Sequence, residues 1–335
     1  MRLTLCLMLI LPTVSLYAAG STGWPQQIQR GVNVSTDITA QDLAHLADDW
    51  KANSVRILVN NITAESPPYQ VSARKKKEVF DCIDLCLGQG FYTVFSPSAS
   101  FRNNDRFFGS EAWKAAYLEF WQEVATRYAG SGGIAYDLMN EPHDNLADLH
   151  WSQYAGELTA AIRAIDSVHT IVVEPPGWGW PAGFDHLVPT GDRNTVYSFH
   201  FYGPMDYTHQ RNRGHMRTTE EQCRQRAYPG DIEGEYWDKE KIRSSIQQAF
   251  EFRDSHKVRI WCGEFGVARW AVGAKLWLGD LIDILEEEKV GWSYYAYREW
   301  HHMDLEMDPA ERVEKTERTE TELVKLFKGY FAGNE

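Results

Sequence analysis

Two glutamates end apolar segments, where a carboxylate is costly unless it is bonded or used. Glu141 ends the segment IAYDLMNEP, and Glu264 ends the segment VRIWCGEFG. An ionised carboxyl group at the end of a buried strand needs a hydrogen bond or a charged partner. A pair of such groups suits proton transfer or nucleophilic attack, and hydrolysis of a glycosidic bond characteristically uses two carboxyl groups that flank one bond.

Other polar side chains also end apolar segments and are candidates for the same site. They are Asn140, His200 and Tyr202, and Arg56, which lies on the segment SVRILVN, is a further candidate. Glu174 and Glu299 are two further acids at segment ends. For each of these two acids, the alternative is a structural ion pair with a nearby arginine.

The elements that must position these residues are short apolar runs separated by amphipathic ones. The eight candidate strands are 31–35, 54–60, 91–98, 134–142, 170–178, 196–204, 258–266 and 291–300. Their nearly continuous apolar character is typical of parallel strands buried on both faces. Most intervals between them show helical periodicity, with Ser72 and Ser110 as expected N-caps.

Eight strand–helix repeats predict an α/β fold, a single-domain (β/α)₈ TIM barrel. A doubly wound open sheet is the alternative, but the glycine-rich phosphate loop that it requires is missing from the sequence. In a barrel, side chains that end the strands meet at one face, which places the candidate residues together. The long interval 205–235 has no strand pattern and is expected to form part of a cleft wall.

Charge and the N-terminal segment limit the class and location of the protein. The chain has 34 basic and 47 acidic residues and a net charge of −13, so we expect no nucleic-acid partner.

Residues 1–19 are predicted to be a secretory signal peptide, because the apolar run is short for a membrane span and Pro12 interrupts it. Residues 20–335 would then form one catalytic domain that is secreted, either to the outside of the cell or to the periplasm. After cleavage we expect this domain to be a monomer without membrane contact.

We expect no metal ion and no cofactor. The first strand carries Asn33 where barrel metallohydrolases need histidines, and the adjacent His301 and His302 would point in opposite directions on a strand. Cys82 and Cys86 have no second cysteine cluster at zinc-like spacing. A metal-dependent barrel hydrolase stays as an alternative that sensitivity to a chelator would reveal.

Three motifs, taken together and in order, identify a resemblance. LMNEP, FHFYGP followed by YTHQ, and CGEFG resemble the clan A glycoside hydrolases, specifically glycoside hydrolase family 5, the cellulase family. The resemblance covers the whole chain after the signal peptide. It implies a retaining enzyme that cleaves a β-linked polysaccharide or oligosaccharide, with a β-1,4-glucan as the leading substrate. Mannan, xyloglucan or β-1,3-glucan are alternative substrates, and a catalytically silent carbohydrate-binding barrel is an alternative function.

The resemblance also implies roles for individual residues. Glu141 corresponds to the acid/base and Glu264 to the nucleophile. Arg56 and Tyr202 would keep Glu264 ionised, since a cation and a hydrogen bond both favour the charged form. Asn140 would bond the 2-hydroxyl of the substrate, and His200 would contact the substrate or the acid/base.

Two departures from the family pattern concern substrate contacts. Ser96-Pro97-Ser98 stands where many members have a histidine, and Trp292-Ser293-Tyr294-Tyr295 stands where many have a tryptophan beneath the cleaved sugar, so the platform is expected to be Tyr295 or Trp292. Sugar rings stack on aromatic faces. The further aromatic candidates for the cleft are Trp178, Trp180, Trp270 and Trp300.

Overall fold

A closed barrel of eight parallel strands forms the centre of the molecule in a computed structural model, which describes residues 23–143, 150–210, 219–310 and 317–334. Around the barrel the strand order is β1-β10-β9-β6-β5-β4-β3-β2. The strands are β1 (Arg30–Val34), β2 (Ser54–Val59), β3 (Tyr92–Pro97), β4 (Ile134–Asp137), β5 (Thr170–Val173), β6 (Thr195–Phe201), β9 (Arg259–Phe265) and β10 (Gly291–Tyr294). All eight pairings are parallel, which confirms the predicted TIM barrel.

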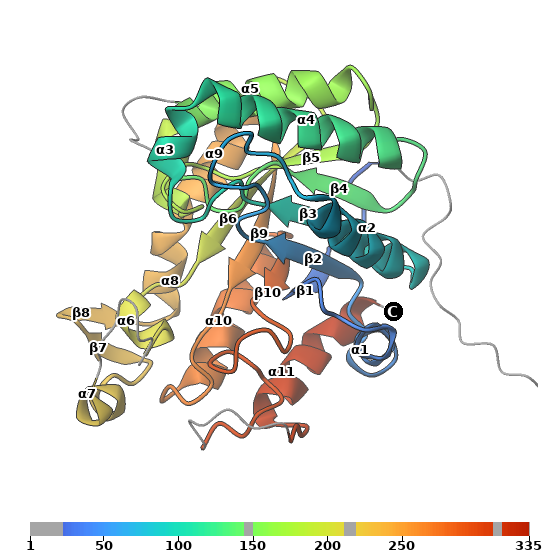
Figure 1. Ribbon diagram of the computed structural model, residues 1–335. Helices are drawn as coiled ribbons and strands as arrows, with labels where there is room; N and C mark the ends of the chain where they lie inside the picture. The colour runs from blue at the N-terminus through green and yellow to red at the C-terminus, as the bar shows by residue number, and fades with distance from the viewer. Residues whose placement is uncertain (1–22, 144–149, 211–218, 311–316, 335) are drawn as a thin grey trace, which may run out of the picture.

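Helices surround the strands, as Figure 1 shows. They are α1 (Ala40–His45), α2 (Ala73–Gly88), α3 (Asn104–Phe108), α4 (Glu111–Tyr128), α5 (His150–Arg163), α6 (Met205–Thr208), α7 (Glu220–Gln225), α8 (Lys239–Ser245), α9 (Gln247–His256), α10 (Ala274–Glu287) and α11 (Glu322–Phe331). A π-helical turn, η1 (Leu46–Trp50), extends α1, and 3₁₀ turns form η2 (Pro181–His186) and η3 (Ala332–Asn334). The fifth unit therefore carries a 3₁₀ helix, η2, between β5 and β6.

Local sequence explains where the longer helices begin and which face they bury. The hydroxyl of Ser72 accepts the backbone N–H of Lys75, and that of Ser110 accepts the backbone N–H of Trp113, so both predicted N-caps are confirmed. The apolar stripe of α4 is buried against the barrel. Except for Arg259, all residues of the eight barrel strands are buried, which accounts for their continuous apolar runs.

The described parts of the interval 205–235 contain strands that the sequence did not predict. They hold α6, α7 and a two-stranded antiparallel hairpin of β7 (Gly230–Ile232) and β8 (Glu235–Trp237). The turn residues Glu233 and Gly234 have φ of 56° and 84°. Two consecutive positive φ values suit the tight turns that match strand twist, so the expectation of a segment without strands was wrong. The hairpin and α7 project from the barrel beside α6 (Figure 1).

Other sequence predictions have mixed outcomes. Cys82, Cys86, Cys223 and Cys262 are free and buried. Among the described helices, none combines the length and the apolar composition needed to cross a bilayer. The predicted signal peptide, residues 1–19, lies outside the described residues.

Candidate active site

Glu264 enters the barrel from a bulge in β9. His200 of β6 pairs with Glu264 although Phe199 pairs with Cys262, so Gly263 is the extra residue. A Cβ atom at Gly263 would lie 2.4 Å from the hydroxyl oxygen of Ser198, which only glycine avoids. Bulges next to active sites re-aim side chains. The bulge here turns the carboxylate of Glu264 towards the centre of the barrel, where it is 4% exposed.

Arg56 on β2 is completely buried and holds the carboxylate of Glu264 from below. Its Nη1 donates to Oε1 of Glu264 over 2.6 Å, while the hydroxyl of Tyr202 donates to the other oxygen over 2.7 Å. The remaining acceptors around the guanidinium are Asn33, Ser96, Asp137, Asn140 and Glu174. Both oxygens of Glu264 thus accept a hydrogen bond, one from Arg56 and the other from Tyr202.

Glu141 has a different environment. It lies just beyond β4, and its side chain is 15% exposed. Burial is the largest cause that raises its pKa, to about 7; the hydrogen bond with His200 opposes this rise, and the charge of Glu264 adds to it. One oxygen of Glu141 and one of Glu264 lie within 4.8 Å of each other. The two carboxyl groups are therefore close together but differ in their surroundings. Arg56 bonds the carboxylate of Glu264, whereas burial raises the pKa of Glu141.

His200 lies between these two carboxyl groups. Its Nδ1 is 3.1 Å from Oε1 of Glu141 and 3.7 Å from Oε2 of Glu264. Burial disfavours the charged imidazole, but the charges of Glu174 and Glu264 overcome it and raise the pKa of His200 to about 10. His200 is thus a cation in the site near neutral pH.

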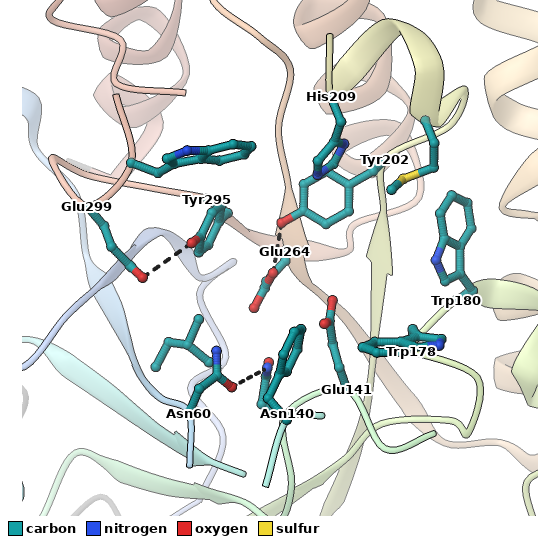
Figure 2. A pocket seen from close by; sticks show the side chains of 14 residues that line it. Asn60, Asn140, Glu141, Trp178, Trp180, Tyr202, His209, Glu264, Tyr295 and Glu299 are labelled. Atoms are coloured by element: carbon teal, nitrogen blue, oxygen red, sulfur yellow. Dashed lines mark hydrogen bonds between the residues drawn. The ribbon is translucent and has the colours of Figure 1, made fainter. Parts of the chain in front are cut away.

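An open pocket of about 730 Å³ lies above the two carboxyl groups, a volume typical of small-ligand sites. Its lining includes most of the predicted residues: Asn140, Glu141, Trp178, Trp180, Tyr202, Glu264, Tyr295 and Trp300. Figure 2 shows Trp178 and Trp180 on one side of Glu264, and Tyr295 and Glu299 on the other. Lining residues therefore lie on both sides of the carboxyl pair.

The pocket also contains residues that were not among the sequence candidates. Met205 and His209 reach it from α6 and the turn that follows, and Asn60, Phe101 and Leu58 line it elsewhere. The expected cleft wall from the 205–235 interval is therefore present in part. The YTHQ motif was the only sequence signal for His209, and nothing in the sequence pointed to Asn60.

Comparison with known proteins assigns the chain to a glycoside hydrolase family, which agrees with the barrel and the pair of carboxyl groups described above. The model of the family described as cellulase, glycosyl hydrolase family 5, matches residues 18–300. The chain belongs to glycosyl hydrolase family 5. The resemblance seen in the three motifs is thereby confirmed, and so is the enzyme class, a glycoside hydrolase, at the level of the family.

Relatives of this family 5 chain include several endoglucanases. Endoglucanase C of Acetivibrio thermocellus is 29% identical over 219 residues, which cover 57% of this chain and 61% of the relative. Endoglucanase Z of Dickeya dadantii is 31% identical over 169 residues, 49% of this chain and 36% of the relative. The chain thus spans less than two thirds of the length of these relatives.

Solved structures share the fold of this family 5 chain. Cel5A of Thermotoga maritima in complex with cellobiose superposes with a TM-score of 0.73 at 22% identity, covering 90% of this chain and 97% of that one. The cellulose synthase subunit Z of Clostridioides difficile superposes with a TM-score of 0.71 at 20% identity, covering 90% and 99%. These likenesses establish the barrel.

Two predicted aromatic residues lie outside the family 5 pocket. Trp292 is completely buried, its ring lies 5.3 Å from that of Phe331, and its indole N–H donates to Glu286. Because side chains alternate along β10, Ser293 faces the barrel interior and Trp292 faces the helices. Trp270 packs against His302 instead of lining the pocket. Of the two platform candidates, Tyr295 is the one that lines the pocket.

At the end of β3, where the sequence has Ser96-Pro97-Ser98, the two serines bond to an arginine and an asparagine. The hydroxyl of Ser96 accepts from Arg56 over 2.7 Å, and that of Ser98 donates to Asn60 over 3.0 Å. The side-chain amide of Asn140 also donates to Asn60, over 3.2 Å. These bonds leave the amide group of Asn60 at the pocket as a donor for a ligand.

Glu141, His200 and Glu264 are close enough to be considered as metal ligands, since their ligand atoms lie within 4.8 Å of one another. A histidine ligand must be neutral and must offer a lone pair to the metal. The raised pKa of His200, and its contacts with carboxylates on both sides, favour the protonated ring. These residues fit acid/base chemistry better than metal binding.

Proposed function

We propose that this protein is a retaining glycoside hydrolase that cleaves β-1,4-linked glucan by double displacement. The observation that carries the proposal is the pair Glu141 and Glu264, with oxygens within 4.8 Å and opposite environments. Retaining enzymes hold their carboxyl groups ~5 Å apart, whereas inverting enzymes leave ~6.5–9.5 Å for a water. The spacing therefore supports the retaining mechanism.

In the first step Glu264 attacks the anomeric carbon of the sugar and forms a glycosyl ester. Arg56 and Tyr202 hold its two carboxylate oxygens by hydrogen bonds before the attack. Glu141, with a pKa near 7, donates its proton to the glycosidic oxygen, and the bond to the leaving sugar breaks.

In the second step the ionised Glu141 removes a proton from water, and the water oxygen attacks the same carbon from the side that the leaving sugar occupied. The ester bond breaks, Glu264 is released as a carboxylate, and Glu141 is protonated again. Two inversions restore the original configuration. Asn140, which lines the pocket beside Glu141, would bond the 2-hydroxyl of the sugar.

The arrangement of the pocket supports an orientation for the glycan. The acid must touch the leaving-group oxygen, so the leaving sugars would lie on the side of Glu141, over Trp178 and Trp180 (Figure 2). The cleaved sugar would lie over Tyr295, near Glu299 and Trp300. Relatives named endoglucanases support a glucan, while mannan, xyloglucan and β-1,3-glucan enzymes of the family make a substrate panel necessary.

We extend the proposal to the setting of the reaction. The protein would be exported by the signal peptide of residues 1–19 and act as a monomer without metal or cofactor. The mass of the mature protein in culture medium or periplasm tests the cleavage site. Size-exclusion chromatography with light scattering tests the monomer.

The function is tested by reducing-end release on soluble β-glucan, carboxymethylcellulose, mannan, xylan and laminarin, with Glu264→Gln as the matched control. Activity on β-glucan that the substitution lowers by several orders of magnitude is the expected result. NMR of the first product should show the β-anomer, as retention requires. A wild-type protein that releases no sugar from any polymer, or releases the α-anomer first, would contradict the proposal.

A further inference from the structure

A third carboxylate, Glu174, lies directly beneath the reacting pair. It follows β5, it is completely buried, and it is not among the residues that line the described pocket. Its backbone carbonyl accepts the indole N–H of Trp151 over 2.7 Å, which anchors the chain at this point. Because neither solvent nor substrate reaches it, Glu174 acts only through the residues that it touches.

Glu174 touches three groups of the site at once. Its Oε1 accepts from Nη2 of Arg56 over 2.7 Å and lies 3.3 Å from Nε2 of His200. Its Oε2 accepts the backbone N–H of Glu141 over 2.8 Å. A Cβ atom at Gly179 would lie 2.9 Å from Oε2 and 3.2 Å from the His200 ring, so a glycine is needed to leave room for this carboxylate.

The bond to Glu141 matters because that residue has an unfavourable backbone conformation. Its φ of 48° lies in the left-handed region, which costs a non-glycine residue ~1–2 kcal/mol. A hydrogen bond from a backbone N–H to a carboxylate is roughly twice as strong as a neutral one. The bond from Glu174 therefore stabilises the conformation that directs the Glu141 side chain to the pocket.

The contact with His200 explains the charge on that ring. Nδ1 of His200 faces Glu141 and Glu264, while Nε2 faces Glu174, so carboxyl groups lie on both sides of the imidazole. Nε2 makes no hydrogen bond within the described part of the chain, but Oε1 of Glu174 lies 3.3 Å from it, and a carboxylate charge at this distance favours the protonated ring. The pKa of His200 is raised for this reason, with the charge of Glu174 as the largest cause that opposes burial.

We propose that Glu174 is a positioning residue of the reaction, which fixes the backbone of Glu141 and keeps His200 protonated between the reacting carboxyl groups. The inference rests on the proposed function for the roles of Glu141 and Glu264. The competing explanation is that Glu174 only balances the charge of Arg56. Arg56, however, already has Asp137 at 3.0 Å and Glu264 at 2.6 Å as carboxylate partners.

The test compares Glu174→Gln with Asp137→Asn. Both substitutions replace a buried carboxylate bonded to Arg56 by its amide, but among the described residues Asp137 makes no hydrogen bond to Glu141 or His200. We expect Glu174→Gln to lower kcat ~100-fold, the cost of a misplaced catalytic group, with KM within about threefold of wild type. Asp137→Asn should lose thermal stability with at least a tenfold smaller loss of kcat.

The second readout is the titration of His200 by ¹⁵N NMR, with its signals identified among the 11 histidines by their loss in His200→Asn. We expect both ring nitrogens of wild type to carry protons at pH 8, and the titration of Glu174→Gln to move at least one pH unit lower, about a tenfold change in acidity. Equal kcat losses in the two amide variants, with an unmoved titration, would overturn the proposal.

Two outcomes separate this inference from the proposed function. If Glu174→Gln does not fold, the wild-type titration still decides, because a His200 that titrates near its ordinary pKa would overturn the proposal. If wild type hydrolyses no glycan, the proposed function fails, while the titration of His200 in the two amide variants still tests the contact with Glu174.

Discussion

Replacing Glu141 by Gln should make the protein more stable above neutral pH while it removes the proton donor. The isosteric amide can still accept the hydrogen bond from His200, so the change removes mainly a charge. The folded protein binds the proton of Glu141 more tightly than the unfolded chain does, because burial and Glu264 raise its pKa from 4.5 to about 7. Wild type therefore loses stability relative to the variant as pH rises through this interval, and the difference stays constant above it.

The magnitude follows from the two pKa values. Each pKa unit corresponds to ~1.4 kcal/mol, so the raised pKa corresponds to about 3 kcal/mol at pH 8 and to well under 1 kcal/mol near pH 4.5. For a chain of this length 1 kcal/mol shifts the melting temperature by roughly 2 °C. Glu141→Gln should thus melt ~6 °C above wild type at pH 8 and close to it near pH 4.5.

Scanning calorimetry of both proteins across this pH range measures the effect. Glu157→Gln, a substitution at an exposed position of α5, controls for the loss of one negative charge from a chain with a net charge of −13. A melting difference that is the same at both pH values, or that matches the Glu157 control, would refute the reasoning. It would show that Glu141 is not held in its neutral form by the fold.

Four further outcomes follow from the same site. The kcat/KM of wild type should fall above about pH 7, where Glu141 loses its proton, as a pH–rate profile would show, and excess EDTA should leave the activity unchanged. Arg56→Lys should lower the free energy of unfolding, measured with urea, by about 3–5 kcal/mol, because a single ammonium group cannot donate to all the acceptors of the guanidinium. Glu299→Gln should raise kcat/KM on carboxymethylated relative to unmodified glucan by roughly two- to fivefold at pH 8, since Glu299 lines the pocket and would repel an anionic sugar; an unchanged ratio would contradict this.

The sequence predicted the barrel and the carboxyl pair for reasons that hold in three dimensions. A polar residue that ends an apolar strand reaches the open face of a barrel, which is how Glu141 and Glu264 come to line one pocket. Asp137 was missed because it lies inside an apolar run, and its partner Arg56 comes from a different strand. An ion pair between segments that are far apart in the sequence cannot be recognised from either segment alone.

The wrong predictions that Trp292 and Trp270 line the cleft have a different cause. Strand periodicity could have placed Trp292 outside the pocket, because a polar Ser293 next to it occupies the interior face. Trp270 comes after β9, outside any regular element, where periodicity assigns no direction to a side chain. His209 lies in the 205–235 interval, where the hairpin and short helices could not be predicted from hydrophobic pattern.

The acceptors of Arg56 come from both ends of the chain, and this limits how the protein could be rebuilt. The guanidinium on β2 bonds side chains on or just after β1, β3, β4, β5 and β9. A fragment that ends after β4 would keep the cation and lose Glu174 and Glu264, while the complementary fragment would keep these anions without their counter-charge. Exchange of half-barrels between relatives would therefore succeed only where both parents carry the same guanidinium and the same ring of acceptors, whatever the match of their outer surfaces.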